Sequence, residues 1–147
     1  MIPVHFFVAL LCAFGVSRGP ACTCVFSGDV RTVVEIQLQR AEAVFSGSVI
    51  ALRWRTVQVF PDAPGSKMME LGAVIVPERT WKGSLVDTLV VWTPDEIGMC
   101  KVPFTEGERY LVFAARGDSG TLHTNNCTGT QPLAGAEAYL RVLGAGK

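Results

Sequence analysis

Two cysteines separated by one residue, Cys22 and Cys24, constrain the fold of this chain more than any other feature. Only Cys100 and Cys127 follow them in the sequence. A bridge between Cys22 and Cys24 would close a strained small ring. An even number of cysteines in an exported chain indicates two disulfides, so both remaining pairings tie the first pair to the second. Such bridges close loops of about 80 to 100 residues, each contributing roughly 4 kcal/mol through chain entropy.

The residues before Cys22 have the composition of an export signal. Residues 2–16 are almost wholly apolar, and the small residues Gly19 and Ala21 occupy the −3 and −1 positions. This pattern predicts a signal peptide over residues 1–21 and cleavage directly before Cys22. We therefore expect a secreted protein, or a periplasmic one if the source is a Gram-negative bacterium.

A membrane anchor is the alternative interpretation of this apolar run. A membrane span requires about 20 predominantly apolar residues, and this run is shorter and interrupted by His5. Cys12 would leave with the signal, so four cysteines would remain. Residues 22–147 are long enough for one domain with one core, and we expect a soluble monomer.

The charge balance excludes some classes of partner. The chain has 13 basic and 13 acidic residues, without a basic run that could neutralise phosphates. We therefore expect neither a nucleic-acid partner nor, after signal removal, a membrane partner.

The hydrophobic pattern predicts a mainly β protein. Helical spacing of apolar residues predicts a short helix over 29–41, after an N-cap at Ser27-Gly28-Asp29, and a last helix over 133–143, stopped by Gly144. Gly47 lies inside the first strand, where a glycine often marks a bulge. The predicted strands cover 43 toward 60, 69–81, 87–93, 109–115 and 121–124. Five short strands with small flanking helices favour a Greek-key barrel of the oligonucleotide/oligosaccharide-binding type, the OB-fold.

Catalytic and metal-binding patterns are weak. His123 is the only histidine after residue 21, and no serine stands in a nucleophile motif that could use it as a base. A metal site of its own would need several ligands. We expect His123 to be a strand surface residue and the chain to be neither an enzyme nor a binder of a cofactor. Asn126-Cys127-Thr128 fits the glycosylation pattern, but its cysteine is needed for a disulfide.

A free N-terminus at Cys22 would have chemistry of its own. The α-amine and the carbonyl oxygen of one residue can chelate a metal in a five-membered ring, and the amine has a pKa near 8. A catalytic zinc keeps one coordination position open for water or substrate, which a rigid terminal amine could displace. The alternative is that the disulfides only staple a small secreted domain.

The order of several short motifs resembles the tissue inhibitors of metalloproteinases, in their N-terminal netrin-like domain. The matching motifs are Cys22-Thr23-Cys24-Val25, Ala43-Val44-Phe45-Ser46-Gly47-Ser48-Val49, Trp81-Lys82-Gly83, Thr93-Pro94 before Cys100, and Gly120-Thr121-Leu122-His123-Thr124 before Cys127. The match covers nearly all of residues 22–143. Members of that family have a third disulfide and a C-terminal domain, and neither has a counterpart in this sequence. The resemblance is therefore to a compact single-domain relative, and a bacterial source is compatible with it.

The resemblance implies a five-stranded barrel with the pairings Cys22–Cys100 and Cys24–Cys127. It also implies that the amine and carbonyl of Cys22 chelate the zinc of a bound metalloproteinase and that Thr23 enters the adjacent pocket. Val25, Gly98 and Met99 would complete the inhibitory ridge. The main alternative is a non-inhibitory extracellular binding module, because a fold does not define a function. A hydrolase using His123 is the third interpretation.

Overall fold

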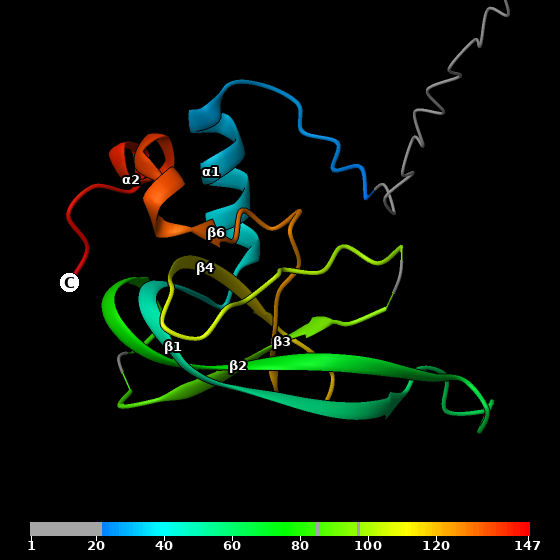
Figure 1. Cartoon of the computed structure of the whole chain (residues 1–147). Coiled ribbons are helices and arrows are strands. Elements are labelled where there is room, and N and C mark those ends of the chain that lie inside the picture. Colours follow the sequence, from blue (N-terminus) through cyan, green and yellow to red (C-terminus); the bar gives the residue numbers. More distant parts are fainter. Residues whose placement is uncertain (1–21, 85, 97) are drawn as a thin grey trace, which may run out of the picture.

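The computed structural model describes residues 22–84, 86–96 and 98–147, so the predicted signal peptide lies outside the described residues. The described chain is mainly β, with the two helices together on one side of the sheet and a long hairpin extending away (Figure 1). In chain order the elements are α1 (Val30–Arg40), β1 (Ala43–Gln58), β2 (Lys67–Lys82), β3 (Leu89–Pro94), β4 (Arg109–Arg116), β5 (Leu122–His123), β6 (Gln131–Pro132), the 3-10 turn η1 (Leu133–Gly135) and α2 (Glu137–Leu143).

The strands form one sheet that closes on itself. Neighbouring strands follow the order β1-β2-β3-β5-β4-β6, and an additional pairing of β1 with β4 completes a ring. All pairs are antiparallel except β3 with β5, where Val91 lies opposite Leu122. Closure pairs residues 44–48 of β1 on both sides, whereas the outer half of β1 pairs with β2 alone in the described chain. The mainly β prediction is therefore confirmed in the described chain.

The first half of β1 is shared by two neighbouring strands, and Gly47 makes this possible. Gly47 pairs with Pro77 of β2 on one side and with Tyr110 of β4 on the other, and the β1–β2 register shifts between Ser46 and Gly47. A Cβ atom at Gly47 would lie 2.5 Å from the carbonyl oxygen of Val76. The glycine thus lets the strand coil into the ring, and the predicted bulge is confirmed.

Two apolar clusters stabilise this arrangement. The first fills the ring and contains Phe45, Val49, Leu71, Ala73, Ile75, Val91, Val102, Phe104, Tyr110, Val112 and Ala114. The second lies between the sheet and the helices, where Val34 of α1 packs with Val44, Leu111, Phe113 and Ala136. Strand residues alternate between these clusters, as in Val44 and Phe45, because successive side chains point to opposite faces.

The start of helix α1 is fixed by a capping hydrogen bond. Asp29 accepts a hydrogen bond from the Thr32 amide at 2.8 Å, and this bond lowers the pKa of Asp29. The cap therefore contributes stability above the ordinary pKa of the carboxyl, and this contribution is lost as pH falls through the lowered value. The helix predicted over 29–41 is confirmed.

Two elements differ from the prediction. The five predicted strands are all present and close the ring, but the described chain has a sixth, short strand, in which Gln131 and Pro132 pair with Leu111 and Tyr110. The helix predicted over 133–143 is split into η1 and α2, with Ala136 between them in a non-helical conformation. Gly144, at φ 75°, ends α2 as predicted. No helix in the described part of the chain is long and apolar enough to cross a membrane.

Candidate functional site: the disulfide-bound N-terminal segment

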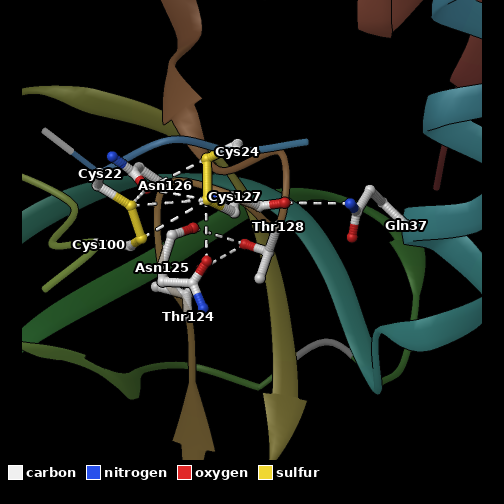
Figure 2. The surroundings of a disulfide bond; sticks show 9 residues. All are labelled: Cys22, Cys24, Gln37, Cys100, Thr124, Asn125, Asn126, Cys127 and Thr128. Carbon is white, nitrogen blue, oxygen red and sulfur yellow. Dashed lines mark hydrogen bonds between the residues drawn. A yellow bond between two sulfur atoms is a disulfide. The ribbon is translucent and has the colours of Figure 1, made fainter. Parts of the chain in front are cut away.

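Two adjacent disulfides bind the first described residues to the folded domain (Figure 2). Cys22 is bonded to Cys100 and Cys24 to Cys127, each with a Cα–Cα distance of 5.2 Å. This is the pairing that the resemblance implies. The loops that carry Cys100 and Cys127 are also joined directly, because the backbone amide of Asn126 donates to the Cys100 carbonyl oxygen at 3.0 Å. One cluster of four cysteines therefore connects three segments that are far apart in the sequence.

The turn that carries Cys127 is bonded to the centre of strand β4. The hydroxyls of Thr124, Thr128 and Thr130 lie 2.9, 3.1 and 3.2 Å from the carbonyl oxygen of Phe113. The Thr130 hydroxyl also accepts a hydrogen bond from the Phe113 amide at 2.8 Å. Thr124 and Thr130 are buried, so these bonds are shielded from water. The turn is consequently a rigid support for the disulfide at Cys127.

Helix α1 supports the same turn from the other side. The buried side chain of Gln37 donates to the Cys127 carbonyl oxygen at 3.1 Å, as Figure 2 shows. The extended segment between Cys24 and the Asp29 cap of α1 is therefore held at both ends, by a disulfide and by the helix.

The side chains of residues 22–26, called the N-terminal segment below, alternate in exposure from Cys22 to Val25. Cys22 and Cys24 are partly buried, whereas Thr23 is exposed and Val25 is 88% exposed. Phe26 is also exposed. The disulfides thus take up the inward-facing positions, and Thr23 and Val25 are free to contact a partner.

The loop before Cys100 presents the other predicted site residues. Gly98 has a φ of 84°, a left-handed conformation that favours glycine, and the position that a Cβ atom would occupy lies in open space. Met99 is 45% exposed. Because Cys100 is bonded to Cys22, the disulfide joins this loop to the N-terminal segment. The structure therefore connects the six predicted ridge residues Cys22, Thr23, Cys24, Val25, Gly98 and Met99 through one disulfide cluster.

Sequence reasoning missed the residues that hold this loop in place. Asp95 accepts a hydrogen bond from the Trp54 indole at 3.0 Å and forms an ion pair with Lys101. Glu96 accepts from the Met69 amide at 2.9 Å. These contacts join the loop to the β1–β2 hairpin, and no local sequence signal indicates them, because the partners lie up to 41 residues apart.

His123 lies on a strand as predicted, but it is half-buried within a polar cluster rather than simply on the surface. Its Nε2 is 2.7 Å from the Thr121 hydroxyl, and its Nδ1 is 3.4 Å from Glu70. Glu70 is buried and forms an ion pair with Arg55 at 2.7 Å. Arg55 in turn stacks on Trp92, 3.8 Å from the ring centroid. This cluster compensates a buried carboxylate, and it does not belong to the N-terminal site.

Searches with models of known protein families and among curated proteins find no match to this chain.

Replacing Asp95 with alanine tests the support of the Met99 loop. We expect Asp95→Ala to lower the free energy of unfolding by about 1–2 kcal/mol, because Trp54 and Lys101 both lose a charged hydrogen-bond acceptor. The Lys101 amide, bonded to the Met99 carbonyl, should exchange its hydrogen faster. Chemical denaturation and hydrogen exchange measure both effects. Asp62→Ala, at the exposed hairpin turn, is the control and should stay within about 0.5 kcal/mol of the unmodified protein.

Proposed function

We propose that this chain is a secreted inhibitor of zinc metalloproteinases with an OB-fold barrel, related to the netrin-like domain of the tissue inhibitors of metalloproteinases. One observation carries the proposal: the residue predicted to be the mature N-terminus is itself disulfide-bonded to the folded domain. A second disulfide follows two residues later. A disulfide that only stabilises a domain need not involve the terminal residue. A disulfide that holds a terminal amine rigidly must lie at that residue or next to it.

The chemistry of a zinc protease fits such a terminus. A catalytic zinc has three protein ligands and an open position that holds water. The Cys22 amine, with a pKa near 8 when free, loses its proton easily beside a divalent cation. Together with the Cys22 carbonyl oxygen it would chelate the zinc and displace the water. Because the disulfides have already ordered the segment, binding would cost little conformational entropy.

The exposed side chains around Cys22 would supply the remaining contacts. Thr23, exposed between two tethered cysteines, would enter the specificity pocket beside the zinc. Val25 and Met99 offer apolar surface, and Gly98 leaves room for the approach of a partner backbone. The chain would act as a monomer and need no cofactor of its own, since the zinc belongs to the target. In this proposal the chain binds an enzyme and is not itself an enzyme.

The direct test is an inhibition panel against zinc metalloproteinases of several classes. The protein used must be oxidised and must begin at Cys22, as verified by N-terminal sequencing of the exported product. We expect inhibition of at least one class and none of serine proteases. A mature terminus at any other residue, or no inhibition across the panel, would contradict the proposal.

Thr23→Gly tests the pocket contact separately from the fold. Glycine removes the side chain that would fill the pocket, so inhibition should weaken by about tenfold or more, which corresponds to about 1.4 kcal/mol. Thr23 is exposed, so thermal unfolding should hardly change. Thr23→Ser is the matched variant, and its inhibition should lie between that of the unmodified protein and that of Thr23→Gly. Equal inhibition by all three proteins would show that Thr23 does not enter a pocket.

A second candidate function has an observation of its own. The β1–β2 hairpin exposes large apolar side chains, among them Trp54 at 57% and Phe60 at 63%. Exposed apolar surface often marks a protein-binding site. A non-inhibitory extracellular binding module would therefore use the hairpin and not the N-terminus. Replacing Phe60 would then abolish partner binding, whereas blocking the Cys22 amine would not.

A further inference from the structure

The sulfur atoms of the two disulfides form a single cluster. Cys127 Sγ, although bonded to Cys24, lies 3.8 Å from Cys22 Sγ and 3.7 Å from Cys100 Sγ. The sulfur atoms of Cys22, Cys24 and Cys127 all lie within 4.8 Å of one another. Figure 2 shows the two bonds side by side. The separations across the disulfides are therefore nearly as short as packing allows.

These separations match a known coordination geometry. Zinc binds four cysteine thiolates tetrahedrally at about 2.3 Å, which places neighbouring sulfur atoms about 3.8 Å apart. Two of the six sulfur–sulfur separations, 3.7 and 3.8 Å, already equal this tetrahedral edge, and the bonded pairs reach it once the disulfides open. We propose that the reduced chain binds one Zn²⁺ through the side chains of Cys22, Cys24, Cys100 and Cys127. This site uses the cysteine sulfurs of this chain, so it does not depend on the proposed inhibitory function.

Half of the site is held together without the disulfides. The Asn126 backbone amide donates to the Cys100 carbonyl oxygen at 3.0 Å, and this bond would still join the two loops in a reduced chain that stays folded. Gln37 and the Asn125 side chain fix the backbone of Cys127, at 3.1 and 2.8 Å. A metal held by Cys100 and Cys127 would then recruit the other two thiolates.

Cys22 and Cys24 can supply those two ligands together. They lie on one short segment, and both sulfurs already face the Cys127 turn. The single residue between them, Thr23, is exposed and leaves the metal side free. Two thiolates from the N-terminal segment and two from the loops of Cys100 and Cys127 thus make up the Cys₄ set typical of structural zinc sites.

Asn126 lies where an outer-shell partner of the metal would be needed. Its side-chain oxygen is 3.5 Å from Cys22 Sγ, 3.6 Å from Cys24 Sγ and 3.5 Å from Cys127 Sγ. Disulfide sulfurs carry no hydrogen to donate. When the amide turns over, its NH₂ group would donate to the thiolates and stabilise their negative charge.

Reduction and oxidation interconvert the disulfide form and the zinc form. A thiol or phosphine reductant gives each disulfide two electrons, two protons complete the pair of thiols, and the reductant is oxidised. Zn²⁺ then displaces the four thiol protons and binds four thiolates. An oxidant that removes four electrons restores both disulfides and releases the metal.

The test uses protein that begins at Cys22, reduced with a phosphine under anaerobic conditions. Titration with Co²⁺ should give the visible and charge-transfer bands of a tetrahedral tetrathiolate site, saturating at one equivalent. Zn²⁺ should displace Co²⁺, bind with an apparent Kd in the nanomolar range or below, and raise the melting temperature of the reduced chain. The oxidised protein has no thiolates to offer, so it should give no charge-transfer bands with Co²⁺ and should not bind Zn²⁺ with nanomolar affinity.

Two variants make the result specific. Cys100→Ser should change the cobalt spectrum to that of three thiolates, and Asn126→Ala should weaken zinc binding by about 10- to 100-fold. A reduced chain that fails to bind zinc, whether folded or unfolded, overturns the proposal. So does a Cys100→Ser protein with an unchanged spectrum. Zinc-induced refolding of an unfolded reduced chain, seen by circular dichroism, supports it.

Discussion

Adding one alanine before Cys22, the predicted mature terminus, is expected to weaken the proposed inhibition of zinc metalloproteinases severely. The extension converts the Cys22 amine into an amide, which is no longer a basic ligand, and moves the free amine by about 3.8 Å along the chain. The added residue would also occupy the space of the metal. We expect a loss of about a hundredfold or more in the inhibition constant, which corresponds to about 3 kcal/mol. Steady-state inhibition assays measure it.

Acetylation of the same amine provides an independent version of this experiment. Near neutral pH the α-amine, with a pKa near 8, reacts before the lysines, whose pKa is near 10.4. The acetylated protein should keep its melting temperature and lose inhibition. A protein acetylated only on lysines is the matched control and should inhibit normally. Inhibition that survives both modifications would exclude chelation through the terminal amine.

Removing either disulfide should strongly destabilise the domain, yet the two removals should differ in function. Cys24 and Cys127 are 103 residues apart and Cys22 and Cys100 are 78 apart. Chain entropy predicts a loss of about 4 kcal/mol for either serine double variant, since the dependence on loop length is weak. Chemical denaturation measures this loss. Release of Cys22 should reduce inhibition more, because it frees the terminal residue itself.

The comparison of these double variants separates rigidity from stability. Both should unfold at similar denaturant concentrations, so any difference in inhibition at low temperature reports the freedom of the N-terminus. If Cys22→Ser/Cys100→Ser inhibits as well as Cys24→Ser/Cys127→Ser, the first disulfide has no role in presenting the amine. Equal and full inhibition by both would exclude pre-ordering as the source of affinity.

Much of the fold could be predicted because its signals are local. The Asp29 cap, the apolar spacing of α1 and the glycine inside β1 each follow from neighbouring residues. The pairing of Gln131 and Pro132 with β4 has no such signal, because a two-residue strand depends on its partner. The break at Ala136 was missed because helical spacing outweighed the low helix propensity of Gly135. The parallel β3–β5 pairing likewise arises only from ring closure.

The candidate site divides in the same way. Cysteine spacing and the predicted export signal single out Cys22 and Cys24 in advance, since few pairings are open to them. The supporting contacts could not be predicted. Trp54 reaches Asp95 only because the hairpin bends beside the loop, and Gln37 reaches Cys127 only after α1 packs on the sheet. Such contacts are set by tertiary structure and leave no periodic pattern.

The separation of the bonded cysteines also dictates an order of biosynthesis. Cys22 and Cys24 leave the ribosome about 80 to 100 residues before Cys100 and Cys127, so neither of the two disulfides can form until most of the chain has been made. Wrong pairs formed in this interval would have to be resolved, a reaction that a disulfide isomerase catalyses. Production in a host that lacks such an enzyme should yield mixed disulfides, with the N-terminal segment as the last part of the molecule to be completed.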